Sequence, residues 1–105
     1  MAALTVGGLI AANSSFAEDW KADHPRRVEV NQRQRHEERR IGKGIKHGQI
    51  DAGEAAQLQA EQQKIHNEQM QDAAMHNGHI TKKEKRQLNR EENAESRQIF
   101  HDRHN

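Results

Sequence analysis

Two copies of one segment set the architecture of this chain: HGQIDAGEAAQL at residues 47–58 and NGHITKKEKRQL at residues 77–88. When the copies are aligned, a glycine, an isoleucine, a glutamate, a glutamine and a leucine coincide in register. A duplication of this kind, at a period of 30 residues, indicates that one supersecondary unit occurs twice.

Each copy carries the signals of a helix end followed by a helix start. A glycine suits the left-handed conformation that ends the preceding helix. An Asp or Thr followed three positions later by Glu is a capping box, whose side chains satisfy free amides at a helix N-terminus. The residues of this structural motif are Gly48, Ile50, Asp51 and Glu54 in the first copy and Gly78, Ile80, Thr81 and Glu84 in the second.

These signals predict an all-α chain. Pro25 occupies a favoured first-turn position, and the second helix contains neither Gly nor Pro after Glu54. Because the turns are short and the helices are of similar length, we expect an up-down-up bundle with two EF-hand-like tight turns. An N-terminal arm over residues 18–24 should precede a helical domain over residues 25–105. The three predicted helices span about residues 25–46, 52–76 and 82–103.

The expected core is thin, because residues 18–105 contain only eleven Leu, Ile, Val and Phe side chains. Ile41 and Ile45, one turn apart, give the first helix a narrow apolar seam. Leu58 and Ile65, one heptad apart, do the same for the second helix. Such seams bury too little apolar surface to offset the ordering entropy of a small monomer. The sequence therefore predicts a homodimer, in which two chains share one core.

Residues 1–17 form a different kind of sequence, because they contain no charged residue. An apolar run over residues 3–12 is followed by Ser15-Phe16-Ala17, which fits the small-x-small rule of signal peptidase. Nothing basic precedes the run, which indicates a truncated or misassigned start of a signal peptide. Export without cysteine favours a periplasmic or secreted protein. Since the run is too short to span a bilayer, we expect no stable membrane anchor.

The charge balance argues against nucleic acid as a partner. The net charge is only +1, whereas phosphate binding needs a net basic face. Glutamates interrupt the arginine-rich residues 26–40, so we interpret this segment as a solvated helix face.

The spacing Gly-x-Ile-x-x-x-Glu resembles the second half of an EF-hand calcium loop, with Ile50 and Ile80 at its apolar bridge position. The resemblance implies that Glu54 and Glu84 take the last ligand position. Calcium is not expected to bind, because loop positions one, three and five should carry Asp or Asn. These positions hold Lys43, Ile45 and His47 in the first copy and Ala73, Met75 and Asn77 in the second. The capping-box interpretation needs no metal.

The same repeat also resembles the Leu-Thr-x-x-Gln repeats of the periplasmic Spy and CpxP stress proteins. Ile50-Asp51-x-x-Glu54 and Ile80-Thr81-x-x-Glu84 carry this resemblance. Leu is replaced by Ile and Gln by Glu in both copies. The resemblance implies a non-enzymatic helical protein with a chaperone or stress-sensing role.

The histidines suggest a metal site. Folding the chain up-down-up sorts six of the eight into two groups, because each turn meets the far end of the non-adjacent helix. Imidazoles clustered in threes suit Cu, Zn or Ni ions. The alternative is that exposed histidines near helix ends cap carbonyls and favour the helix dipole. The predicted metal ligands are His24, His76 and His79 in one group and His47, His101 and His104 in the other.

The sequence does not favour an enzyme, because catalysis usually needs a concave, largely apolar pocket that this composition cannot build. We expect an exported binding protein that acts as a transition-metal buffer or sensor. The alternative is a chaperone-like stress protein that acts on protein clients.

Overall fold

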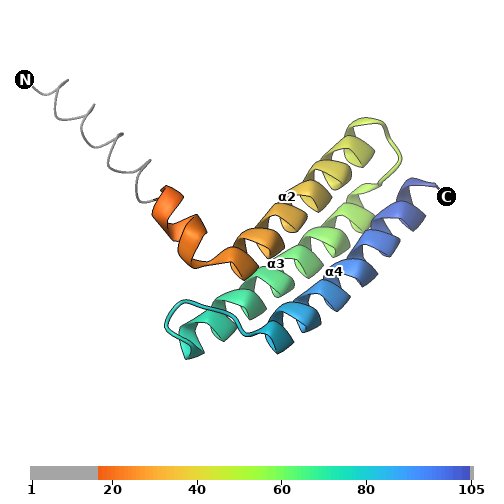
Figure 1. Ribbon diagram of the computed structural model, residues 1–105. Coiled ribbons are helices and arrows are strands. Elements are labelled where there is room, and N and C mark those ends of the chain that lie inside the picture. Colours follow the sequence, from red (N-terminus) through yellow and green to blue (C-terminus); the bar gives the residue numbers. More distant parts are fainter. Residues whose placement is uncertain (1–16, 105) are drawn as a thin grey trace, which may run out of the picture.

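The computed structural model describes residues 17–104. The predicted signal peptide, apart from residue 17, lies outside the described residues. Three long helices pack side by side (Figure 1), and each contacts the other two. They are α2 (Pro25–Lys46), α3 (Ala52–Met75) and α4 (Lys82–Arg103). Between residues 17 and 104 there is no β-strand, so the all-α prediction is confirmed.

The expected count of three helices is wrong, because residues 17–23 are also helical where we expected an arm. This helical segment ends at His24, whose φ of −128° and ψ of 56° are not helical. A residue before proline is pushed out of the α region, so Pro25 separates this helix from α2. Figure 1 shows the resulting change of direction. Among the described residues, no helix has the length and apolar character needed to cross a membrane.

Glycines close the two turns between the long helices. Gly48 and Gly78 have φ values of +70° and +92°, the left-handed region that favours glycine. In the first turn the carbonyl of Gly44 accepts hydrogen bonds from the amides of Gln49 at 2.8 Å and Ile50 at 3.1 Å. In the second turn the Gly78 amide donates to the carbonyl of Ala73 at 2.7 Å. These bonds satisfy carbonyls that a helix end leaves free.

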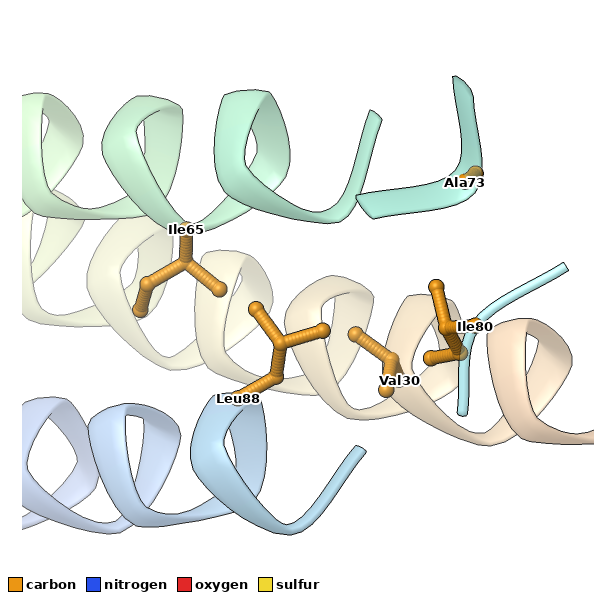
Figure 2. Close-up of a cluster of buried hydrophobic side chains, with 5 residues drawn as sticks. All are labelled: Val30, Ile65, Ala73, Ile80 and Leu88. Carbon is orange, nitrogen blue, oxygen red and sulfur yellow. The ribbon is translucent and has the colours of Figure 1, made fainter. Parts of the chain in front are cut away.

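Each helix buries side chains at alternating spacings of mainly four and three residues, the heptad pattern of helices packed side by side. The large aliphatic side chains at these positions form two clusters. The first apolar cluster, shown in Figure 2, consists of Val30, Ile65, Ala73, Ile80 and Leu88. The second apolar cluster consists of Ile41, Ile50, Leu58 and Ile99.

The apolar seam of α2 differs from the expected one. Ile41 is buried as predicted, whereas Ile45 remains 43% exposed. Gly44 takes the core position instead, and the side chain of Ile50 fills the space above it. A turn isoleucine thus replaces a helix isoleucine in the core.

The arginine-rich segment is only in part the solvated face that we expected, because Arg35 and Arg39 are exposed whereas Arg33 and Arg40 are half-buried. Arg33 donates to the side chain of Asn93, and Arg40 donates to the Ser96 hydroxyl at 2.6 Å and to its carbonyl at 3.2 Å. These arginines therefore join α2 to α4.

Two glycines two residues apart in α2 provide a matched test of this packing. A Cβ atom at Gly44 would overlap Cδ1 of Ile50 and lie 2.7 Å from its Cγ1, whereas a Cβ at Gly42 would meet nothing within 4 Å. We expect Gly44→Ala to lower the free energy of unfolding by about 1–3 kcal/mol through overpacking. Gly42→Ala should raise it by about 0.5–1 kcal/mol, because alanine favours the helix. Urea denaturation followed by circular dichroism measures both, and equal effects would contradict the packing of Ile50 onto Gly44.

Candidate functional site

The glutamates of the two EF-hand-like turns bind backbone amides. Glu54 accepts a hydrogen bond from the Asp51 amide at 3.0 Å, and its own amide donates to the Asp51 carboxylate at 2.8 Å. Glu84 accepts from the Thr81 amide at 2.8 Å and donates its amide to the Thr81 hydroxyl at 3.1 Å. Both turns therefore hold complete capping boxes.

One pair of the predicted histidine ligands is in direct contact. The rings of His24 and His79 stack with centroids 4.4 Å apart and planes inclined by 12°. Trp20 stacks on the other side of His24, at 4.5 Å and 13°. The helical segment of residues 17–23 and the second turn therefore meet through a stack of three rings, although His24 and His79 are far apart in the sequence.

Two arginines at the start of α2 hold the second turn in this position. Arg26 donates to the carbonyl of Ile80 at 3.1 Å, and Arg27 donates to the carbonyl of Gly78 at 2.9 Å. The guanidinium of Arg27 also lies over the Trp20 ring, 5.0 Å from its centroid, in a cation–π contact. Sequence reasoning missed these arginines because it interpreted residues 26–40 as a solvated face.

The hydrogen bond of His24 defines which ring nitrogen is available to a ligand. Its Nδ1 lies 2.8 Å from the carbonyl oxygen of Trp20. A carbonyl can only accept, so Nδ1 carries the proton and the neutral ring keeps a lone pair on Nε2. Metal-ligating histidines usually have their other nitrogen bound in this way.

The remaining predicted ligands make separate contacts. In the second turn, Nδ1 of His76 bonds to the carbonyl of Asp72 at 3.0 Å and lies 3.4 Å from the Glu84 carboxylate. At the other end of the bundle, Nδ1 of His104 bonds to the carbonyl of Phe100 at 2.7 Å. His47 and His101 are exposed. Within residues 17–104, no three His, Asp or Glu side chains are arranged to hold a metal ion.

A second group of polar side chains, which sequence reasoning missed, lies between the two apolar clusters. We call it the central polar layer, and its members are all buried. Gln62 donates from Nε2 to Glu37 at 3.0 Å and to Glu95 at 3.4 Å. The layer consists of Gln34 and Glu37 of α2, Gln62 of α3, and Glu92 and Glu95 of α4. The sequence did carry a signal for this layer, because its residues continue the heptad spacing of the buried aliphatic residues in the same helices.

Burial disfavours the ionised form of the three glutamates in the layer. It raises the pKa of Glu92 to about 8, with the neighbouring Glu37 carboxylate adding to the effect. Burial raises the pKa of Glu95 to about 7, against a hydrogen bond from Gln62 that lowers it. Burial likewise raises the pKa of Glu37, although Gln62 and Arg33 oppose the shift. The layer therefore holds protons near neutral pH.

Comparisons of the chain with protein-family models, curated proteins and solved structures find no match. Two groups of side chains are the candidates for a function: the ring stack of Trp20, His24 and His79, and the central polar layer.

Substitutions in the second turn separate a helix cap from a calcium ligand. Thr81→Ala removes the cap acceptor and should lower the free energy of unfolding by about 1 kcal/mol. Glu84→Gln should cost only a few tenths of a kcal/mol, because glutamine also completes a capping box. Millimolar Ca²⁺ should change neither value, as measured by urea denaturation. A calcium-dependent rise in wild-type stability that Glu84→Gln abolishes would contradict the capping role.

Proposed function

We propose that the protein is an exported, non-enzymatic helical protein that captures a transition-metal ion with His24 and His79. The observation that carries this proposal is the contact between these two rings, which the turn and Arg27 support. Imidazole nitrogens suit Cu²⁺, Ni²⁺ and Zn²⁺. A capture site with two histidines leaves the other coordination positions of the ion to water or to a further side chain.

The stacked rings must separate for both nitrogens to reach one ion. The lone pair of an imidazole nitrogen lies in the plane of its ring, so the lone pairs of two nearly parallel stacked rings do not converge. A tetrahedral ion needs both lone pairs to point at it. Metal binding should therefore turn His79 away from His24 or pull His24 away from Trp20. This reorganisation distinguishes a buffer or sensor from a closed structural metal site.

Trp20, the only tryptophan of the chain, reports on this movement. We expect calorimetry to detect binding of Cu²⁺, Ni²⁺ or Zn²⁺, accompanied by a change in Trp20 fluorescence. His24→Ala and His79→Ala should each weaken binding by at least about tenfold, which corresponds to 1.4 kcal/mol. His36→Ala is the matched control, because His36 is exposed on α2 and outside the ring stack. Equal affinities in all four proteins would refute the proposal.

We further propose that the protein forms a homodimer through the groove between α2 and α3. This groove has a volume of about 510 Å³, and Ile41 and Ile45 contribute its apolar lining. The thin core supports association, and Ile45 is the large aliphatic side chain that the bundle leaves half exposed. The same groove favours a second candidate function, the binding of apolar side chains of a client protein by a chaperone-like stress protein.

Light scattering of the wild type at tens of micromolar should give twice the mass of one chain. Ile45→Asp should give the mass of one chain with unchanged helicity, because Ile45 lies outside both apolar clusters. A monomeric wild type would exclude the dimer. If Ile45→Asp then also lost the ability to suppress client aggregation, independently of metal, the groove would belong to the second candidate function.

A further inference from the structure

The central polar layer interrupts the core at its middle. Along α2 it lies between Val30 and Ile41, and along α4 between Leu88 and Ile99. Each of these four residues belongs to one of the two apolar clusters. Any charge in the layer is therefore enclosed by apolar packing on both sides along the bundle axis.

The carboxylates of the layer have too few hydrogen-bond donors for buried charges. Glu92 is 0% exposed and Glu37 is 1% exposed. Among the described residues, both oxygens of Glu92, Oε2 of Glu37 and Oε1 of Gln62 have no hydrogen-bond partner. A buried polar atom without a partner costs about 1–3 kcal/mol, and an ionised carboxylate costs more.

One arginine faces this group of carboxylates at short range. Nε of Arg33 lies 3.5 Å from Glu92 and 3.6 Å from Glu37, and its side chain is 33% exposed. Of the more distant groups, Arg40 of α2 is cationic and acts on Glu37. The anionic ones are Glu61 of α3 and Glu91 and Asp102 of α4, which act on Glu92 or Glu95. When all three layer glutamates are ionised, negative charge exceeds positive charge at the bundle centre.

We propose that the central polar layer is a pH-sensitive switch, which holds the bundle closed while its glutamates are protonated and loosens it when they ionise. A protonated carboxyl carries an O–H donor, and Gln62 Oε1 and the carboxyl oxygens that lack partners are acceptors within the same layer. Loss of the protons removes these donors and leaves like charges facing one another. Separation of the helices at the layer then admits the water that the ionised groups need.

The pKa values of the layer give the direction of the switch. An unfolded glutamate has its ordinary pKa of 4.5, whereas Glu95 and Glu92 in the folded chain have values of about 7 and about 8. A group whose pKa is raised by folding contributes its full stability below the unfolded value and loses it as the pH rises through the folded value. The bundle should therefore be most stable near pH 4–5 and lose stability up to about pH 8.

Urea denaturation of the full chain at several pH values, in buffer with a chelator, tests the switch. We expect the equilibrium constant for unfolding to rise at least about tenfold between pH 5 and pH 8. Amide hydrogen exchange of α3 around Gln62 should accelerate over the same range. Constant stability, or stability that increases with pH, would overturn the proposal. Because no metal is present, this result is independent of capture by His24 and His79.

Three variants assign the effect to the layer. Glutamine resembles protonated glutamate in shape, so Glu92→Gln should remove most of the pH dependence of stability. This variant should also be more stable than the wild type at pH 8. Glu95→Gln provides the same test if Glu92→Gln fails to fold. Glu18→Gln, at an exposed position outside the three long helices, should leave the pH dependence unchanged.

A surface pair offers the rival explanation for the same pH range. Burial and a hydrogen bond with Glu91 raise the pKa of Glu68 to about 7. Glu68 is only half-buried, so solvent screens its charge, and Glu68→Gln should remove a smaller part of the pH dependence than Glu95→Gln. If Glu68→Gln removed it entirely while Glu92→Gln and Glu95→Gln retained it, the switch would not lie in the layer.

Discussion

Insertion of a turn isoleucine into each end of the bundle is the constraint on which the rest of the structure depends. Ile50 and Ile80 follow the glycines that end α2 and α3, and they precede the caps that start α3 and α4. Each isoleucine is buried in one apolar cluster, so the cluster, the turn and the next helix start form together. The duplicated segment therefore acts twice, once at each end of the bundle. It fixes the direction and register of the three long helices, although the buried core contains only eight large aliphatic side chains.

This arrangement explains why the middle of the bundle tolerates a polar layer. Because the two apolar clusters lie on either side of the layer, side chains of glutamine and glutamate need only fill the space between them. Burial of Glu37, Glu92 and Glu95 destabilises the fold, and the core has little apolar area to offset this free-energy cost. A large apolar core would conceal such a cost, whereas a thin one makes the stability of the whole fold depend on the protonation of a few groups.

Much of the fold could be predicted from local signals, and most of the misses share one physical cause. Capping boxes and glycines act within a few residues, so the bounds of the long helices are readable from the sequence. The burial of Glu92, the core position of Gly44 in place of Ile45, and the tertiary bonds of Arg27 depend on neighbours distant in sequence. Composition assigns charged residues to the surface on average, and only packing shows which of them are enclosed. The helical segment at residues 17–23 was missed for another reason, because Pro25 was taken as the start of the first helix.

The second turn connects the ring stack to the core. His79 and Ile80 are consecutive residues, and while His79 is exposed and contacts His24, Ile80 is buried with Val30 in the first apolar cluster. A loosening of the bundle at the central polar layer weakens the packing that holds Ile80, and with it the position of His79 relative to His24. A ligand that binds the folded chain stabilises it in proportion to the logarithm of its concentration. An ion held by His24 and His79 would therefore oppose the loosening that ionised glutamates cause, so that metal and protons would stabilise the same closed bundle from two separate sites.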